Sequence, residues 1–543
     1  MKPVILIILD GYGIAPAGPG NAIYLANPTF INSLIYSYPN TTLKASGEAV
    51  GLPAGEPGNT EVGHINLGAG RIVYQDLPRI NMSIADGSFY SNGTFLKAIS
   101  HVKNTNGKLH LLGLVGQGSV HSHLDHLYAL LYLSKENNLN DVYIHAITDG
   151  RDSSPESGLE IINRVSERLN DFKVGKIASI MGRYYAMDRD RRWERIEKAY
   201  SCLTKGIGNK FSTPAEAIKS SYSQGRTDEF IEPSLIIQED GSTVSIGEGD
   251  AVIFFNYRID RPRELTKAFV LENFEQDANK TPSFDPYAVK YYKTHMFQEK
   301  ILTPPFSRDE KIKNLVFVTM TEYEKNLPAD SAFPPLRVKM PLGRIISEKG
   351  LNQLRITESE KERFVTYYFN GQTEIIFPQE ERLIIPSPKV ATYDFKPEMS
   401  ANELTQALLE KMRSLNYSFI LVNIPNPDMV GHTGNIQATI SAIKTVDSCL
   451  KKIITEAMIL NYNVLVTADH GNAEEKINLT TGGISTEHTN NVVPLVIVNN
   501  EWQGRSKKLQ SGVLADVAPT ILSLMKIDKP SDMTGRNLVE ELV

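Results

Sequence analysis

The chain is poor in cysteine, since it holds only Cys202 and Cys449, which lie far apart and outside any Cys-x-x-Cys spacing. This scarcity argues against a disulfide framework and a thiolate metal site, and it fits a reducing cytoplasm. Long hydrophobic runs are missing as well. The apolar stretch Val4 to Leu9 meets Asp10 and is too short for a secretory signal or a membrane span. We therefore expect a cytoplasmic protein that does not bind membranes.

The chain also lacks a large excess of either positive or negative charge. The formal net charge is −6 and the isoelectric point is near 6.1, which argues against a surface that binds nucleic acid. A small anionic substrate needs only a local basic pocket, so such a substrate stays compatible with this charge. The 543 residues exceed the size at which one core keeps growing, and we therefore expect two domains in a hinged monomer.

Several short aliphatic runs end at a polar residue, which is typical of buried parallel strands whose carboxyl ends carry functional groups. Helical patterns lie between these runs and would supply the covering layers of an α/β sandwich. The expected strands are Val4 to Leu9, Phe419 to Val422 and Val464 to Thr467, and the expected helices are Asn402 to Arg413 and Ile436 to Ala457.

Candidate metal ligands occur near both ends of the chain and arginines in its middle, so we expect a discontinuous domain that carries a second, inserted domain. Residues 274–311 are polar and aromatic and contain prolines, which is typical of a linker or a surface excursion. The expected metal-binding domain comprises residues 1–75 and 312–543, and the inserted substrate-binding domain residues 78–303, with hinges near 74–78 and 302–313.

Three aspartates and three histidines form a candidate metal constellation. Asp428 and His432 are four residues apart, so in a helix they would share one face. Asp10 and Asp469 with His470 directly follow expected strands, and His488 completes the set. Each residue alone is more often a turn or cap residue, but six together suit two divalent ions. Oxygen and nitrogen ligands favour Mn²⁺, Mg²⁺, Co²⁺ or Zn²⁺.

Thr60 is a candidate nucleophile, because it follows a glycine-rich loop and precedes an expected helix through Ile65 to Ala69. Coordination to a cation and a helix amino terminus would both favour its alkoxide. The alternative is that Thr60 is simply the N-cap of that helix. Lys361 could add positive charge beside a phosphoryl group, although a solvated surface lysine is the plainer interpretation.

Nine sequence strings resemble, in order along the chain, the motifs of the cofactor-independent phosphoglycerate mutases of the alkaline phosphatase superfamily. Together they span nearly the whole sequence, and the longer ones are specific. The strings are LDGYG (9–13), GNTEVGH (58–64), VHSH (120–123), DGRD (149–152), GRYYAMDR (182–189), RIDR (258–261), NPDMVGHTG (426–434), ADHGN (468–472) and EHT (487–489).

The resemblance implies an alkaline-phosphatase-like α/β sandwich with an inserted α/β domain, and it implies the ligands of two metal ions, with manganese the first expectation. One ion would be held by Asp428, His432 and His488. The other would be held by Asp10, Thr60, Asp469 and His470. The implied substrate-binding residues are His121, Arg151, Asp152, Arg183, Arg189, Arg258, Arg261 and Lys361, and Glu360 matches the pattern without a clear role.

The implied reaction interconverts 3-phosphoglycerate and 2-phosphoglycerate in glycolysis and gluconeogenesis without 2,3-bisphosphoglycerate. Arginines would grip the phosphate and the carboxylate in bidentate fashion, and closure of the domains would exclude water. Thr60 would carry the phosphoryl group, Lys361 would stabilise it, and Asp152 would move the hydroxyl proton. Arg191, Arg192 and Arg195 are interpreted instead as a solvated helix face.

The chain departs from the family pattern at its nucleophile, where threonine replaces serine and adds a methyl group that stiffens the side chain. Residues 116–119 lack the usual acidic residue, Arg363 stands where histidine is common, and the segment 274–311 is longer than usual. Two alternatives stay open: a metal-dependent phosphatase or phosphopentomutase of the same superfamily, and a catalytically impaired paralogue in which Thr60 blocks transfer.

Overall fold

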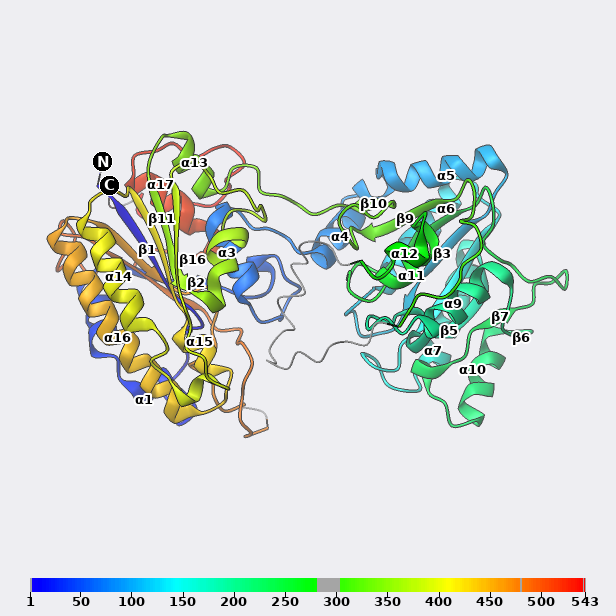
Figure 1. Ribbon diagram of the computed structural model, residues 1–543, viewed down its shortest axis with the longest axis horizontal. Helices are drawn as coiled ribbons and strands as arrows, with labels where there is room; N and C mark the ends of the chain where they lie inside the picture. The colour runs from blue at the N-terminus through cyan, green and yellow to red at the C-terminus, as the bar shows by residue number, and fades with distance from the viewer. Residues whose placement is uncertain (1, 281–302, 479–480, 541, 543) are drawn as a thin grey trace. The chain divides into compact units, whose positions relative to one another are not determined.

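The computed structural model describes residues 2–280, 303–478, 481–540 and 542. The chain divides into two compact units, which are described separately here. Unit 1 comprises Met1–Pro78 and Leu336–Val543, and unit 2 comprises Arg79–Pro335. Each unit is built around an eight-stranded sheet with helices on its faces (Figure 1). Among the described residues, no helix is both long and apolar enough to cross a membrane.

The core of unit 1 is a sheet in the order β12-β11-β13-β1-β14-β15-β2-β16. Neighbouring strands from β12 to β14 run parallel, and β15 is antiparallel to both β14 and β2. Every residue of β1 is buried, as expected for a strand covered on both faces. The strands are β1 Val4–Leu9, β2 Asn40–Lys44, β11 Gln353–Glu358, β12 Glu380–Ile385, β13 Phe419–Ile424, β14 Asn463–Thr467, β15 Val493–Val498 and β16 Gly512–Val513.

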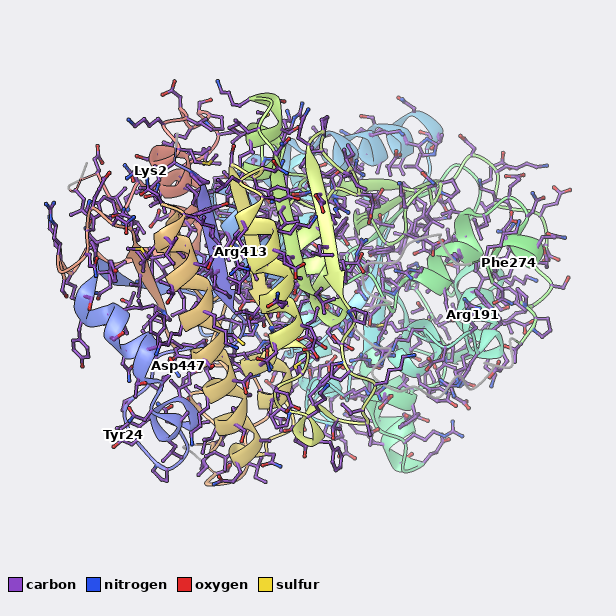
Figure 2. The ribbon with its side chains drawn as sticks, turned by 60° about the vertical axis from the view of Figure 1, so that its left-hand side comes forward. Lys2, Tyr24, Arg191, Phe274, Arg413 and Asp447 are labelled. Atoms are coloured by element: carbon purple, nitrogen blue, oxygen red, sulfur yellow. The ribbon has the colours of Figure 1, made fainter. Side chains whose placement is uncertain are left out.

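Helices α14 and α16 cover one face of this sheet, and α3 lies on the other (Figure 1). Arg413 at the end of α14 donates to Glu456 of α16 over 2.7 Å, and Asp447 of α16 accepts from the backbone of Phe30 and Ile31 in α2 (Figure 2). The helices are α1 Ala22–Ala26, α2 Thr29–Ser37, α3 Thr60–Ala69, α13 Leu342–Glu348, α14 Ala401–Arg413, α15 Asn426–Gly431, α16 Ile436–Ile459 and α17 Val517–Leu524.

Unit 2 has a sheet in the order β10-β9-β8-β3-β4-β5-β7-β6, parallel except between β5 and β7. Its strands are β3 Leu109–Val115, β4 Val142–Thr148, β5 Lys176–Gly182, β6 Asn209–Phe211, β7 Ser234–Ile236, β8 Ala251–Phe254, β9 Val316–Thr321 and β10 Asp330–Phe333. Its helices are α5 Gly93–Thr105, α6 Leu124–Glu136, α7 Gly158–Phe172, α8 Arg183–Ala186, α9 Trp193–Lys205, α10 Pro214–Ser223, α11 Arg263–Val270 and α12 Phe274–Asp277, while α4 Asp76–Ala85 crosses the boundary.

The predicted strands and helices of unit 1 are confirmed. Two of them, α14 and β14, begin one residue earlier than predicted, and two, β13 and α16, end two residues later. The predicted strand from Phe419 continues to Ile424, and the predicted helix from Ile436 continues to Ile459. Strand β1 lies between β13 and β14 and is parallel to both. The α/β fold class predicted from the sequence is therefore correct.

The predicted second domain boundary is wrong. Strand β9 pairs with β8 and β10 pairs with β9, so residues 316–333 belong to unit 2 and the boundary falls after Pro335 rather than at 302–313. The expected linker at 274–311 is also partly wrong, because Phe274 is fully buried and Arg308 donates to the carbonyl oxygens of Ala268 and Leu271. Residues 281–302 of that segment lie outside the described residues.

Candidate active site

The carboxyl edge of the parallel strands in unit 1 gathers the first cluster. Strands β1, β13 and β14 are adjacent and parallel, so the residues that follow them meet at one edge. Asp10 follows β1, Asp469 and His470 follow β14, and Asp428 lies on α15, directly after β13. All four side chains are buried. These residues are far apart in the sequence, but they form a single site because the strands that precede them are neighbours in the sheet.

Asp10, Asp469 and His470 offer donor atoms that all lie within 4.8 Å of one another. The Nε2 atom of His470 is 3.5 Å from an oxygen of each aspartate. Asp469 Oδ1 also accepts from its neighbour's backbone N–H at His470, over 3.1 Å, which fixes the orientation of the carboxylate. This group has the composition of one divalent-cation site.

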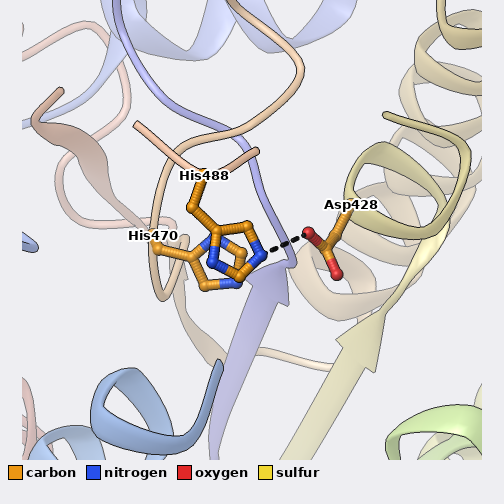
Figure 3. Close-up of side chains that lie close together, drawn as sticks. All are labelled: Asp428, His470 and His488. Carbon is orange, nitrogen blue, oxygen red and sulfur yellow. Dashed lines mark ion pairs between the residues drawn. The ribbon is translucent and has the colours of Figure 1, made fainter. Parts of the chain in front are cut away.

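Asp428, His470 and His488 form a second group with the same spacing, and His488 Nε2 lies 3.2 Å from Asp428 Oδ1 (Figure 3). His432 is adjacent, because its Nε2 atom is 3.1 Å from Asp428 Oδ1 and 3.0 Å from His488 Nε2. His432 therefore lies beside Asp428 and His488, the two residues with which the resemblance predicts that it shares an ion. The structure also places His470 between the two groups.

The three imidazoles share one orientation. In His432, His470 and His488 the Nδ1 atom faces a backbone carbonyl oxygen, at 2.7, 3.2 and 2.9 Å, respectively. A proton on Nδ1 donates to that carbonyl and leaves the Nε2 lone pair directed toward the carboxylates. Such carbonyl contacts are the usual outer support of metal-bound histidine. The donor set thus fits two divalent ions in both atom type and orientation.

Thr60 is the first residue of α3 and not its N-cap. The N-cap is Asn59, whose side chain accepts from the backbone N–H of Glu61 and Val62, so the capping alternative is wrong. The Thr60 hydroxyl is buried and lies 2.9 Å from His470 Nε2 and 3.0 Å from Lys361 Nζ. Because asparagine satisfies the helix end, the threonine oxygen can face the carboxylate cluster.

Lys361 is buried, so its interpretation as a solvated surface lysine is wrong. It lies on the short helix η5 Ser359–Lys361 that follows β11. Its ammonium donates to Asp10 Oδ1 over 2.8 Å and to Asp428 Oδ2 over 2.7 Å. Burial alone would lower the pKa of Lys361, but Asp10 and Asp428 outweigh burial and raise the pKa above its ordinary value.

The cluster carries more negative than positive charge. Three buried carboxylates face two cationic groups, the Lys361 ammonium and the His470 imidazole. Burial raises the pKa of Asp428, but Lys361 and His432 together outweigh burial, so the pKa of Asp428 is well below its usual value. Burial likewise disfavours charged His470, but Asp469 and Asp10 raise its pKa to about 9. Carboxylates held in their charged form at neutral pH are a strong attraction for divalent cations.

The carboxyl edge of the unit 2 sheet gathers the predicted substrate residues. The loop after β3 carries His121, the loop after β4 carries Arg151 and Asp152, the loop and helix after β5 carry Arg183 and Arg189, and the loop after β8 carries Arg258 and Arg261. These four strands are neighbours in the order β8-β3-β4-β5, and each runs parallel to the next.

Carboxylates that the sequence interpretation passed over hold these arginines. Arg183 donates over 2.5 Å to both Asp149 and Asp152. Asp260 pairs with Arg189 over 2.7 Å and with Arg258 over 3.1 Å. Asp152 was predicted, whereas Asp149 and Asp260 were not. Both of these lie inside matched motifs, but an acidic residue does not attract an anionic substrate, so no feature of the sequence favoured them. Their role becomes visible only as ion pairs that orient the guanidiniums.

His121 lies between two carboxylates, since its Nε2 is 3.7 Å from Asp152 Oδ2 and its Nδ1 is 3.7 Å from Asp260 Oδ1. Burial is the main cause that lowers the pKa of His121 to about 3. Burial raises the pKa of Asp152, but Arg183 outweighs burial and lowers it. A neutral imidazole and an ionised carboxylate are thus adjacent at neutral pH.

The remaining basic residues differ in their surroundings. Arg261 donates to the carbonyl of Met187 over 3.1 Å, and Arg151 lies 3.6 Å from Glu229 at the surface. Arg195 lies on α9 and is only partly exposed, because it stacks 3.7 Å from the ring centre of Tyr184 and pairs with Asp188, so the prediction of a solvated helix face is only partly correct for it. Arg191 and Arg192 precede α9, which begins at Trp193, and therefore form no helix face.

Two residues near Lys361 that the sequence interpretation singled out make contacts outside the metal cluster. Glu360 accepts from the hydroxyl of Tyr393 over 2.8 Å. Arg363 forms a paired hydrogen bond with Glu374 at the surface.

Comparison with known proteins gives a consistent result. Residues 80–325 match the profile described as the BPG-independent PGAM N-terminus, and residues 345–510 match that of type I phosphodiesterase / nucleotide pyrophosphatase. The 2,3-bisphosphoglycerate-independent phosphoglycerate mutase of Moorella thermoacetica is 48% identical over 538 residues, which cover 99% of this chain and 98% of the relative. The mutase of the same name from Clostridioides difficile is 45% identical, with coverage of 99% of each chain.

A solved structure agrees. Phosphoglycerate mutase from Leishmania mexicana, determined at low cobalt concentration, is 26% identical and superposes with a TM-score of 0.57, covering 98% of this chain and 97% of that one. The matches extend over both units, because they cover 98 to 99% of the chain. The chain therefore belongs to the family of 2,3-bisphosphoglycerate-independent phosphoglycerate mutases.

Proposed function

We propose that this protein interconverts 3-phosphoglycerate and 2-phosphoglycerate, without 2,3-bisphosphoglycerate, in glycolysis and gluconeogenesis. The reaction would proceed through a phosphoenzyme on Thr60. The observation that carries the proposal is the position of the Thr60 hydroxyl, which contacts both His470 and Lys361 at the edge of three buried carboxylates. Family membership supports the same reaction, because the relatives named above carry that activity in their names.

Two divalent ions would complete the site in unit 1. Asp428, His432 and His488 would hold one ion, and Asp10, Thr60, Asp469 and His470 the other. Manganese is the first expectation, with Mg²⁺, Co²⁺ and Zn²⁺ as alternatives, because the donors are oxygen and nitrogen without thiolate. When bound, the ions supply the Lewis acidity that favours the Thr60 alkoxide and offsets phosphoryl charge.

In the first half of the reaction, the Thr60 oxygen attacks phosphorus and the bond to the glycerate oxygen breaks. The Lys361 ammonium, which stays charged, stabilises the equatorial phosphoryl oxygens. Thr60 would attack as the alkoxide, having released its own proton to solvent when the ions bind. Asp152 is ionised in the substrate-free chain, so it would take up one proton as the substrate binds and give that proton to the departing glycerate oxygen, with the neutral His121 as its neighbour. In the second half, Asp152 takes the proton of the other glycerate hydroxyl, whose oxygen attacks the phosphoryl group and releases Thr60.

The arginines of unit 2 supply the grip on the substrate. A phosphoglycerate carries a phosphate and a carboxylate, and planar guanidiniums bind both with paired hydrogen bonds. Arg183, Arg189 and Arg258 are already oriented by aspartates, and Arg151 and Arg261 complete the set. Fixed guanidiniums lose little freedom on binding, and they would hold glycerate while it reorients between the two half-reactions.

A coupled assay tests the proposal. The full chain is freed of metal, reconstituted with Mn²⁺ and given 3-phosphoglycerate with enolase present and no bisphosphoglycerate. We expect enolase product to form, and we expect a chelator to stop it. Release of inorganic phosphate faster than 2-phosphoglycerate would instead show a phosphatase, and activity gained only after Thr60→Ser would show an impaired paralogue.

A further inference from the structure

His64 has no role in the reaction described above, yet it is fully buried beside the site. It lies on α3 four residues after Thr60, and its Nδ1 atom is 3.0 Å from the Thr60 carbonyl oxygen. The same nitrogen is 3.2 Å from Asp469 Oδ2. One imidazole edge therefore contacts both the backbone of the proposed nucleophile and a carboxylate of the cluster.

The opposite edge of the ring contacts Asn423, a buried residue of β13. The Asn423 amide nitrogen is 3.1 Å from His64 Nε2 and donates to Asp10 Oδ2 over 2.8 Å. An ionised carboxylate only accepts hydrogen bonds, so the amide nitrogen and not the amide oxygen must face Asp10. The amide oxygen is then left facing the Thr357 hydroxyl, 3.4 Å away.

These contacts fix the proton on His64. Because Asn423 uses one amide hydrogen for Asp10 and the other for His64 Nε2, that ring nitrogen must accept. The proton is then on Nδ1, where it points at Thr60 and Asp469. Hydrogen bonds thus run from Asp10 through Asn423 and His64 to the Thr60 carbonyl, and His64 Nδ1 also lies 3.2 Å from Asp469 Oδ2, an oxygen that has no hydrogen-bond partner of its own among the described residues.

We propose that His64 and Asn423 together form a bridge that positions Asp10, Asp469 and Thr60 as ligands of one ion. The bridge contacts both carboxylates and also the backbone carbonyl of Thr60, in the first turn of α3. It rests on the proposed function, because the ion itself belongs to that proposal. His64 and Asn423 touch no substrate, so they are positioning residues rather than catalytic ones.

The bridge serves one ion only, because Asp428 is supported elsewhere. Asn472 donates to Asp428 Oδ1 over 2.9 Å, and the buried Lys476 in turn donates to the Asn472 side chain. Each proposed ion therefore has its own outer support, one through His64 and Asn423 and one through Asn472. Removal of an outer support of this kind typically weakens metal binding by about 10- to 100-fold.

The simpler explanation of His64 is core packing, since its ring lies 5.9 Å from that of Phe364. Packing and positioning predict different results. Loss of packing would destabilise the fold and weaken both ions alike. Loss of the bridge would lower the affinity of one site for its ion and leave the affinity of the other site unchanged. The ratio of the two affinities therefore distinguishes positioning from packing.

The test is titration of the metal-free full chain with Mn²⁺, with free Mn²⁺ measured by electron paramagnetic resonance and heat by calorimetry. In the unaltered chain we expect two bound ions. In His64→Leu and Asn423→Leu we expect one of the two affinities to fall by about 10- to 100-fold, with no further loss in the double variant. Asn472→Leu is the matched control and should lower the affinity of the other site for its ion.

His64→Asn is the conservative variant. Its amide can place an N–H near the position of Nδ1 but cannot reach Asn423, so it should recover part of the lost affinity. The bridge would be overturned if the variants lowered both affinities equally or left both unchanged. It would also be overturned if the unaltered chain bound fewer than two ions. Selective loss of one ion in a chain that lacks mutase activity would instead reject the proposed function and support the bridge.

Discussion

The surroundings of Lys361 decide what that side chain can do. Burial by itself favours a neutral amine, but the ammonium contacts Asp10 and Asp428, and their charges raise its pKa. A lysine in this position stays positive throughout the neutral range and can face a phosphoryl group as a fixed charge. Thr60 gains from the same neighbours, because its hydroxyl lies beside Lys361 and His470.

The first prediction concerns Thr60. Thr60→Ala removes the proposed nucleophile, and we expect turnover in the enolase-coupled assay to fall by at least about 10³-fold, which corresponds to roughly 4 kcal/mol of barrier. Thr60→Ser keeps the hydroxyl and loses only the methyl group, so we expect turnover within about tenfold of the unaltered chain. Intact-mass measurement after a substrate pulse should show a phosphorylated species for threonine and serine but not for alanine.

Thr445→Ala, at a half-buried position of α16 that lies outside the site, is the matched control and should leave turnover unchanged. An alanine form at position 60 that still turns over substrate at the normal rate would remove Thr60 from the mechanism.

At the scale of the element, the amino end of α3 holds the reactive group. Asn59 caps this helix through two hydrogen bonds of 3.1 Å, so Thr60 occupies the first helical position with its hydroxyl turned toward the cluster. The cap thus determines both the stability of the helix end and the position of the nucleophile. Parallel strands supply the other side, because β1 and β14 end together and deliver Asp10 and Asp469 to the same edge.

The second prediction concerns Asn59. Asn59→Ala removes the cap, and we expect a loss of about 1 kcal/mol in the free energy of unfolding. Because Thr60 is the next residue, turnover should fall by much more than such destabilisation explains, roughly 10-fold or more. Asn92→Ala is the control, since Asn92 caps α5 in the same way in unit 2. It should cost similar stability, measured by urea unfolding, with turnover retained. Equal activity in the two variants would contradict the argument.

At the scale of the whole molecule, each unit has its own core, its own sheet and one tryptophan. Trp502 is buried in unit 1 and Trp193 in unit 2. Fluorescence of Trp193→Phe therefore reports unfolding of unit 1, and that of Trp502→Phe reports unfolding of unit 2. This separation allows a condition that acts on one unit to be distinguished from one that acts on both.

The third prediction concerns metal removal. Three buried carboxylates repel one another in unit 1, and ions bound only by the folded state stabilise it by mass action, by about 4 kcal/mol at a thousand times the dissociation constant. We expect a chelator to lower the melting temperature of unit 1, observed in Trp193→Phe. The melting temperature of unit 2, observed in Trp502→Phe, should not change. An equal shift in both units would place the ions elsewhere.

The fourth prediction concerns acid. In unit 2, His110 lies 2.9 Å from His145 and 3.1 Å from Asp250, and His145 is 2.8 Å from Ser179. Burial lowers the pKa of both histidines, that of His145 well below its usual value, although Asp250 partly offsets the effect at His110. The unfolded chain binds these protons near pH 6.5 and the folded chain does not.

The contribution of His110 and His145 to the stability of unit 2 is therefore complete above about pH 6.5 and is lost as the pH falls below that value toward their lower folded pKa values. Urea unfolding of Trp502→Phe between pH 5 and 7.5 measures this slope, and His145→Gln should flatten it. His101→Gln, at the end of α5 and outside this network, should not. A slope unaffected by His145→Gln would show that other groups cause the acid sensitivity.

The local pattern of residues was enough to predict the fold class, the main strands of unit 1 and the groups that lie at the ends of those strands. Hydrophobic runs such as Val4–Leu9 are local signals of a strand. A polar residue that directly follows a parallel strand must lie near the carboxyl edge of the sheet. Which strands pair is a long-range matter, so only the tertiary structure assigned β9 and β10 to unit 2. Likewise, only three-dimensional contact brought Lys361 to Asp10 and joined His64 to Asn423, because hydrogen bonds between residues hundreds of positions apart leave no local pattern in the chain. The pairing of Asp260 with Arg189, 71 positions away, also became visible only in the folded chain.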